Sequence, residues 1–392
     1  MSTLQELLET NEAEKLAALK TAAPKGWERG NERIGDYGVG STGPIEPGTT
    51  VSEQLLLERA GFDPEEWQIV GDVNYREWDA NIGGGVIKTM QYRKFNVKRR
   101  NHAGKDIEEL IKSVNRRKRT PSPGSGAATH VFASGDWQLG KIDGDGTEGS
   151  VDRVLAGIDQ SVRMLKQSRK RDVGFAHIAF MADCGEYFVS QGGKNIWRTD
   201  LTVTETHRLV RRLMLYAIDE HAPYVDRLTV VAVPGNHDQA IRQPGITTYD
   251  DSFDVDALIA VTDAMTLNPA VYGHVETYVP KRDSKLVTMD VNGTNIMHLH
   301  GEDVRPGKHW DWWKGQAFEP GVDPAQADIM LFAHGHHFMV DTKGSRTAIM
   351  TPATESESTW WKNKTGDHGA PGSLVFTAEG GKPRGLTIVG SL

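Results

Sequence analysis

Acidic, amide and imidazole side chains recur at five places along this sequence, each directly after a short apolar run. The five segments are Gly135-Asp136-Trp137-Gln138, Ala182-Asp183, Gly235-Asn236-His237-Asp238, His298-Leu299-His300-Gly301 and Ala333-His334-Gly335-His336-His337. Open α/β sheets place their ligands in the loops at the carboxyl ends of strands. Oxygen and nitrogen donors without thiolates suit Mn²⁺, Fe²⁺, Zn²⁺ or Mg²⁺ rather than a structural cysteine–zinc site. The pattern therefore predicts a metal centre.

The elements that must position these residues alternate between strand and helix. Apolar runs predict strands over 130–134, 176–181, 228–233, 286–291, 294–299, 329–333, 374–377 and 386–389, and helices over 151–167, 202–218 and 254–265. Asn292-Gly293, between two of these strands, is a strong hairpin signal. The order predicts an α/β sandwich whose central sheets are covered by helices.

In order and spacing, the five segments resemble the motifs of the calcineurin-like metallophosphoesterase superfamily. That pattern is Asp-x-His/Gln, Gly-Asp, Gly-Asn-His-Asp/Glu, a His before Gly, and Gly-His-x-His, and the resemblance covers about residues 131–352. The segments that begin at Gly135 and Gly235 are most similar to the branch containing the double-strand-break-repair nucleases. The resemblance implies a four-layer α/β/β/α sandwich.

The resemblance also implies two divalent metal ions, with Mn²⁺ as the first choice and Fe²⁺, Zn²⁺ or Mg²⁺ as alternatives. The first metal position would use Asp136, Gln138, Asp183 and His336, and the second would use Asp183, Asn236, His300 and His334, with Asp183 bridging them. Two such ions, ~3.5–4 Å apart, clamp a phosphate and activate a water for in-line attack on phosphorus.

The resemblance gives the residues after Asn236 a different role. His237 would not be a metal ligand but would stand over the phosphate as an acid or charge stabiliser. Asp238 would orient it, since a carboxylate commonly orients a catalytic imidazole.

The sequence departs from the family pattern at three positions. Gln138 replaces the commoner His, which leaves an oxygen donor but should weaken the binding of a soft metal. Ala182 replaces the Gly before the bridging Asp, and Ala333 replaces the Gly of the last motif if His334 and His336 are the ligand pair.

Two histidine clusters leave a choice of ligand. A frame that starts at Gly335 keeps the Gly of the last motif but loses its second His, so we prefer His334 and His336, whose alternate positions at one strand end reach two metals. Between His298 and His300 we choose His300, because Gly301 follows it.

Charge is unevenly distributed along the 392 residues. The formal net charge of −8 argues weakly against a nucleic-acid partner. Residues 88–119, however, hold twelve Lys or Arg against three acidic residues, a surplus of nine. Next to a candidate for phosphodiester cleavage, this segment predicts DNA binding through phosphate contacts. The expected contacts are Arg93, Lys94, Lys98, Arg99, Arg100, Arg116, Arg117, Lys118 and Arg119.

The basic segment ends at a stretch rich in Pro and Gly, which predicts a linker. We therefore expect an amino-terminal α+β module over 1–120, a linker over 121–129 and a catalytic domain over 130–392. In the module we expect helical composition over 4–21, irregular chain over 26–50, a helix through residue 59 with Ser52 as N-cap and Gly61 as stop, and strands over 67–74 and 86–97. Such a module before such a catalytic domain is similar to some phage proteins.

Composition limits the class of protein. The chain is 38% hydrophobic and 25% charged, which is typical of soluble globular proteins, and no apolar run reaches the ~18–20 residues of a membrane span. The polar amino terminus lacks a signal-peptide centre, and the single Cys184 cannot form an internal disulfide. We expect a cytoplasmic protein without a membrane partner; a homodimer and an ATPase partner stay open.

Two further groups have a structural interpretation. Asp143-Gly144-Asp145-Gly146 lacks the full ligand series of a calcium loop and is typical of a surface turn. Trp310, Trp312 and Trp313 favour packing, with base stacking as the alternative.

Together these features predict a metal-dependent phosphodiesterase, specifically a DNA nuclease. The first alternative is a phosphatase or phosphodiesterase for small molecules such as nucleotides, and the second is a non-catalytic nucleic-acid-binding protein. Salt separates the first two, because DNA cleavage should weaken steeply with ionic strength.

Overall fold

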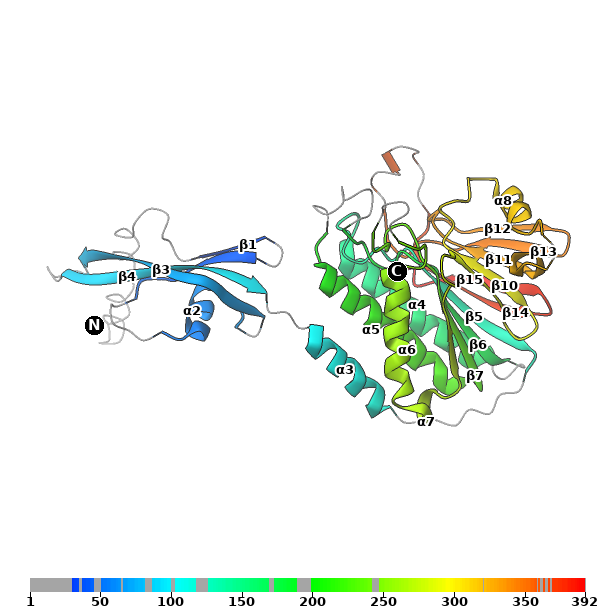
Figure 1. The fold of residues 1–392 in the computed structure, drawn as a ribbon, viewed down its shortest axis with the longest axis horizontal. Coiled ribbons are helices and arrows are strands. Elements are labelled where there is room, and N and C mark those ends of the chain that lie inside the picture. The colour runs from blue at the N-terminus through cyan, green and yellow to red at the C-terminus, as the bar shows by residue number, and fades with distance from the viewer. Residues whose placement is uncertain are drawn as a thin grey trace, which may run out of the picture. The chain divides into compact units, whose positions relative to one another are not determined.

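A computed structural model separates the chain into two compact units, Met1–His102 and Ala103–Leu392 (Figure 1). The residues that it describes are 30–34, 37–45, 51–64, 66–81, 87–99, 103–117, 126–168, 173–188, 199–241, 247–319, 321–357, 359, 362–363, 366 and 369–391. The helical composition expected over 4–21 falls outside them. Among the helices described, none has both the length and the apolar character needed to cross a membrane.

The amino-terminal unit is a four-stranded antiparallel sheet with one described helix. Its strand order is β1-β2-β4-β3, with β1 (Gly30–Ile34), β2 (Tyr37–Ser41), β3 (Trp67–Asn81) and β4 (Ile87–Arg99). Helix α2 (Glu53–Ala60) begins after Ser52, whose side chain accepts the backbone N–H of Leu55, and ends at Gly61 with a φ of 83°. The predicted cap and stop are confirmed.

Strands β1 and β2 lie in the segment that we expected to be irregular. The expectation was wrong because glycine was counted only as a breaker. Gly40 lies against the ring of Phe95, and a Cβ there would stand 2.6 Å from Phe95 Cε2. Glycine at this point permits close packing against the core of the unit, which also includes Leu57, Trp67 and Val97.

The boundary between the units differs from the one expected near residue 121. Helix α3 (Ala103–Arg116) belongs to the second unit, where Leu110 and Val114 are buried in its main core. Asn268 Nδ2 also donates to the carbonyl oxygen of Val114 at 2.9 Å. The basic composition of the segment concealed its apolar stripe, which packs against α5 and α6 (bounds below).

The second unit contains two sheets. The six-stranded sheet has the order β15-β14-β5-β6-β7-β8. Its strands are β5 (Ala128–Ser134), β6 (Val173–Phe180), β7 (Arg227–Ala232), β8 (Val275–Tyr278), β14 (Ser373–Glu379) and β15 (Lys382–Val389). The five-stranded sheet has the order β12-β13-β11-β10-β9. Its strands are β9 (Leu286–Asp290), β10 (Asn295–Leu299), β11 (Ile329–Phe332), β12 (Met339–Lys343) and β13 (Arg346–Met350).

Helices connect these strands. They are α4 (Gly146–Ser168), α5 (Val203–His221), η3 (Ala222–Tyr224), α6 (Phe253–Thr266), α7 (Pro269–Tyr272), α8 (His309–Gln316) and η4 (Asp323–Gln326). The three helices expected from the apolar pattern correspond to α4, α5 and α6. The predicted hairpin joins β9 to β10, with φ values of 52° at Asn292 and 80° at Gly293, as a two-residue turn of this kind requires.

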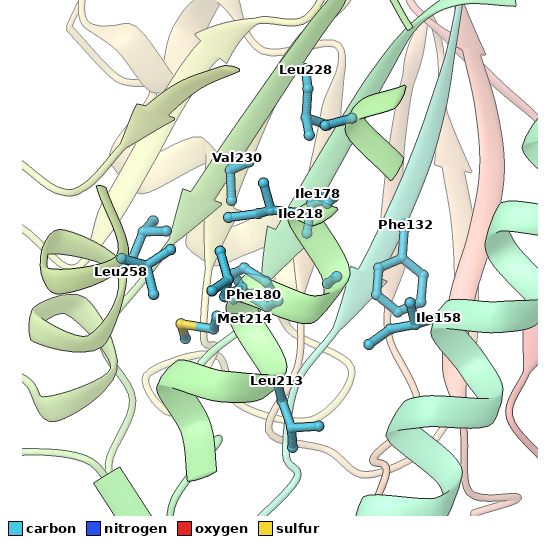
Figure 2. Close-up of a cluster of buried hydrophobic side chains, with 14 of the residues drawn as sticks. Phe132, Ile158, Ile178, Phe180, Leu213, Met214, Ile218, Leu228, Val230 and Leu258 are labelled. Atoms are coloured by element: carbon cyan, nitrogen blue, oxygen red, sulfur yellow. The ribbon is translucent and has the colours of Figure 1, made fainter. Parts of the chain in front are cut away.

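Three buried clusters stack the second unit into layers. The first fills the space between the six-stranded sheet and α4, α5 and α6, where Phe132, Ile178 and Val230 meet Ile158 and Ile218 (Figure 2). The second lies between the sheets and includes Val131, Ala179, Ile296, Leu331 and Ile349. The third includes Met297, Phe332, Trp313 and Ala327, from the five-stranded sheet, α8 and the end of η4. The predicted α/β/β/α order is confirmed.

Candidate metal centre

The expected metal-binding residues follow the carboxyl ends of five strands. In the six-stranded sheet β5, β6 and β7 run parallel, and Asp136, Asp183 and Asn236 come after them. In the five-stranded sheet β10 and β11 run parallel, and His300 and His334 follow them. Parallel pairing brings the carboxyl ends of the strands to one edge of each sheet, which gathers residues that are far apart in the sequence.

The backbone at this edge is strained. Eight described non-glycine residues have positive φ, and six of them, with φ between 44° and 70°, are Asp136, Gln138, Ala182, Asp183, His334 and His336. Such conformations cost of order 1–3 kcal/mol each and cluster at functional sites. At Ala182 the φ of 70° explains why the family pattern has a Gly at this position.

His300 is the centre of the second metal position. Its Nδ1–H donates to the carbonyl oxygen of Met181 at 2.9 Å, so in the neutral ring Nε2 carries the lone pair. That nitrogen lies 2.8 Å from Asp183 Oδ2 and 3.2 Å from His334 Nδ1. Two atoms that both carry lone pairs approach to 2.8 Å only with a cation between them, either a proton on Nε2 or a metal ion. The candidate ligand atoms of Asp183, His300 and His334 all lie within 4.8 Å of one another, close enough to share a metal.

The first metal position is centred on Asp136 and His336. His336 Nε2 lies 3.2 Å from Asp136 Oδ1, and its Nδ1 lies 2.7 Å from Glu355 Oε1. Gln138 Oε1 accepts a hydrogen bond from Lys141 Nζ at 2.7 Å. Glu355 and Lys141 were missed from the sequence, although Glu355 follows the end of β13 much as the expected ligands follow their strands.

Among the oxygens of the expected ligands, Asn236 Oδ1 is buried with no hydrogen-bond partner in the described part of the chain. Asp136 Oδ1 and Asp183 Oδ2 are also buried, and the contacts found for them are the imidazole contacts given above. Leaving such groups unpaired is costly, and each is a hard donor of the type that divalent cations bind. The residues present therefore fit the metal ions that the resemblance implies.

Carboxylate charge dominates the electrostatics of the site. Burial raises the pKa of Asp183, yet nearby His300 holds that pKa well below its usual range. Burial lowers the pKa of His336, yet Asp136 and Glu355 raise it to about 10. These directions describe buried anions that require neighbouring positive charge, which protonated imidazoles or metal ions can supply.

His237 is oriented by Glu186. The Nδ1 atom of His237 lies 2.6 Å from Glu186 Oε2, and its Nε2 lies 4.0 Å from Asp183 Oδ2. Burial lowers the pKa of His237, but Asp183 and Glu186 outweigh it, so the pKa is raised. A protonated Nε2 can therefore face the metal centre, as the expected role requires.

The expectation that Asp238 orients His237 was wrong. Asp238 Oδ1 accepts the backbone N–H of Gly235 at 2.7 Å, and its Oδ2 accepts the hydroxyl of Ser252 at 2.7 Å. Asp238 holds the loop after β7, and burial next to Asp183 raises its pKa to about 6. Adjacency in sequence suggested the wrong carboxylate, since neighbouring side chains in a turn point in different directions.

The structure shows which histidines of the two clusters lie at the candidate metal centre. His298 is buried between the sheets, where its Nε2 lies 2.9 Å from His177 Nε2. His337 is exposed, and its ring Nδ1 lies 2.8 Å from the carbonyl oxygen of Gly335. Thus His300, His334 and His336 face the carboxylates, which agrees with the chosen frames.

The expected nucleic-acid contacts are divided between the two units. Arg93, Lys94, Lys98 and Arg99 belong to β4, while Arg116 and Arg117 lie at the end of α3. Arg100, Lys118 and Arg119 lie outside the described residues. Arg117 Nη2 is 3.0 Å from the buried Asp219 Oδ2, so this cation serves the packing of α3.

A cavity adjoins the second metal position. Its volume is about 340 Å³, and its walls include His300, Tyr249, Lys285, Glu302 and Trp312. Of the three tryptophans noted in the sequence, Trp313 is buried and Trp310 stacks on it with ring centroids 5.5 Å apart. Packing explains those two, and Trp312 is the one that lines the cavity.

The other residues noted in the sequence have structural partners. Asp145 lies in a turn, as expected, and it accepts two hydrogen bonds of 2.5 and 2.8 Å from Arg153 of α4. Cys184 is buried, and its backbone N–H donates to Asp254 at 2.7 Å.

Comparison with known proteins gives only distant similarities. No protein-family model and no curated protein matches the chain. Among solved structures, vacuolar protein sorting 29 from Cryptosporidium parvum covers 66% of this chain and 97% of its own, at 12% identity and a TM-score of 0.32. An archaeal phosphodiesterase covers 66% and 99%, at 11% identity and a TM-score of 0.32. Entamoeba histolytica Vps29 complexed with Zn²⁺ covers 63% and 84%, at 13% identity and a TM-score of 0.29. Similarity at this level does not transfer an activity to this chain.

Proposed function

We propose that this protein is a metal-dependent phosphodiesterase of the calcineurin-like metallophosphoesterase superfamily and that it acts on DNA as a nuclease. The observation that carries the proposal is the convergence of three buried oxygens, those of Asp136, Asp183 and Asn236, with three imidazoles at the carboxyl ends of five strands. Divalent ions bound there would supply the charge that activates a water and neutralises a phosphate.

In this proposal the residues of the site have separate roles. Asp136, Gln138, Asp183 and His336 would hold the first ion, and Asp183, Asn236, His300 and His334 the second. His237, kept protonated by Glu186, would place positive charge next to a phosphate oxygen or donate a proton to the leaving oxygen.

DNA as the substrate rests on the basic segment. Strand β4 carries Arg93, Lys94, Lys98 and Arg99, a density of cations suited to a phosphate backbone. The branch suggested by the Gly135 and Gly235 motifs points in the same direction.

A second candidate is a phosphodiesterase for nucleotides. The cavity of about 340 Å³ next to His300 favours it, because Tyr249 and Trp312 offer aromatic surface close to the metal centre. A base could rest there while its phosphate reaches the metal ions.

The test is hydrolysis by the full chain in the presence of Mn²⁺. Labelled single- and double-stranded DNA, nucleotide phosphodiesters and bis(p-nitrophenyl) phosphate serve as substrates, with His237→Ala as the control for catalysis. Cleavage of DNA that His237→Ala abolishes supports the nuclease. Hydrolysis of the small substrates with all DNA left intact refutes the nuclease and supports the second candidate.

A further inference from the structure

The two expected metal positions differ in how close their ligand atoms lie and in the types of ligand they offer. Asp183, His300 and His334 already bring three ligand atoms within 4.8 Å of one another, and they form the sole such group of His, Cys, Asp or Glu in the described part of the chain. The first position depends instead on Gln138, a neutral amide that is a weaker ligand than imidazole for most transition metals.

Lys141 engages that amide. Its Nζ donates to Gln138 Oε1 at 2.7 Å and to Glu355 Oε2 at 2.6 Å, and the lysine side chain is only 12% exposed. One acceptor direction of Gln138 is therefore occupied by an ammonium group. A divalent ion on the same oxygen would face that positive charge at close range, where water screens it poorly.

Lys141 is also linked indirectly to a second expected ligand of the first position, His336. The carboxylate that receives its hydrogen bond, Glu355, also places Oε1 2.7 Å from His336 Nδ1, and His336 Nε2 faces Asp136 at 3.2 Å. Lys141 thus contacts Gln138 directly and is linked to His336 through one carboxylate. At the second position, by contrast, His300 is held by the carbonyl oxygen of Met181, a neutral group.

We propose that Lys141 is a positioning residue that lowers the affinity of the first metal position, so that divalent ions bind in two separate steps with the second position filled first. This rests on the proposed metal centre. Lys141 holds the ligands of the first position in place and at the same time weakens the binding of a cation there.

Titration calorimetry of the full, metal-free chain with Mn²⁺ alone tests the proposal without any substrate. We expect two binding events whose dissociation constants differ at least tenfold. In Lys141→Met the weaker event should tighten at least tenfold while the tighter one stays unchanged, and Lys141→Arg, which keeps the charge, should retain the separation. Lys166→Met is the matched control and should behave as the wild type, because Lys166 is on α4 and lies over the ring of Tyr224 in η3.

The titration of the wild-type chain tests the proposal without depending on whether a variant folds. Two events of equal affinity would overturn the proposal, as would a weaker event that Lys141→Met leaves unchanged while its circular dichroism matches that of the wild type. If Mn²⁺ binds in two steps but no phosphodiester is hydrolysed, the proposed function fails and this inference stands. If the chain hydrolyses phosphodiesters but binds two Mn²⁺ ions with equal affinity, the proposed function stands and this inference fails. If the chain binds no Mn²⁺, both the proposed function and this inference fail.

Discussion

At the scale of single residues, two glutamates outside the ligand motifs complete the site. Glu186 holds His237 at 2.6 Å, and Glu355 holds His336 at 2.7 Å. A carboxylate next to an imidazole fixes its orientation and raises its basicity, and removing such a partner commonly costs ten- to a hundredfold in affinity or activity. In the proposed site, Glu186 and Glu355 therefore orient the histidines on which catalysis and metal binding depend.

Glu186→Gln is expected to lower kcat on bis(p-nitrophenyl) phosphate by about 10–100-fold. The substitution keeps the shape of the side chain but removes the charge that raises the pKa of His237. In the proposed mechanism His237 acts in its protonated form, so the alkaline limb of the pH–rate profile should move to lower pH. Glu379→Gln, which alters a surface pair with Arg384, is the control. A variant with unchanged kcat and pH profile would remove Glu186 from the mechanism.

At the scale of elements, a buried chain of hydrogen bonds ties helices to the six-stranded sheet. His130 of β5 lies 2.9 Å from the Ser161 hydroxyl of α4, which lies 2.8 Å from His221 of α5. His221 Nδ1–H donates to the carbonyl oxygen of Ala217. Burial lowers the pKa of His130 to about 3 and that of His221 to about 4, so both are neutral in the folded protein.

Acidification below pH 6.5 is therefore expected to destabilise the metal-free protein. In that range His130 and His221 bind protons in the unfolded state but stay neutral in the folded state, so the free energy of unfolding falls as the pH falls. Each of the two contributes about 1.4 kcal/mol per pH unit until its folded pKa is reached. Urea unfolding with a chelator at pH 6.5, 5.5 and 5 measures the slope.

A matched pair of variants identifies the source of that slope. His130→Asn should reduce it by about one proton, whereas Ser345→Asn, at an exposed position without a titrating group, should leave it unchanged. A slope that is the same in His130→Asn and in the wild type would contradict the assignment.

The packing of α3 against the second unit is also expected to contribute to stability. A chain that begins at Ala103 should be more stable than one that begins at Gly126, by about 3–6 kcal/mol, because the shorter chain loses the burial of Leu110 and Val114. It also leaves Asp219 without Arg117. Urea unfolding compares the two, and equal stabilities would show that residues 103–117 do not contribute to the fold of the second unit.

At the scale of the whole molecule, the proposed function assigns DNA binding to the amino-terminal unit and hydrolysis to the second unit. We expect the chain that begins at Ala103 to bind DNA more weakly than the full chain and with a shallower dependence on salt. The reason is that each phosphate left without a cation reduces the slope of log K against log salt by about 0.9. Turnover of bis(p-nitrophenyl) phosphate should be similar in both chains. Fluorescence anisotropy over a range of salt concentrations measures the difference, and identical slopes would exclude the amino-terminal unit from DNA binding.

Sequence reasoning succeeded where one local rule decided the outcome. The cap at Ser52, the stop at Gly61 and the Asn292-Gly293 hairpin depend on residues within a few positions of each other. It failed at β1, β2 and α3, because their stability comes from partners that are distant in the chain. The strand role of Gly40, for example, depends on the ring of Phe95, which belongs to a different strand.

The sequence by itself determined the α/β order of the elements, the uneven charge and the set of donors able to bind metal, because strand periodicity and donor chemistry are properties of short segments. Only the tertiary structure decided which carboxylate orients His237, which of two histidines faces Asp183, and that Lys141 engages Gln138. These contacts join loops from different strands, and their geometry is set by how two sheets pack, which no local pattern encodes.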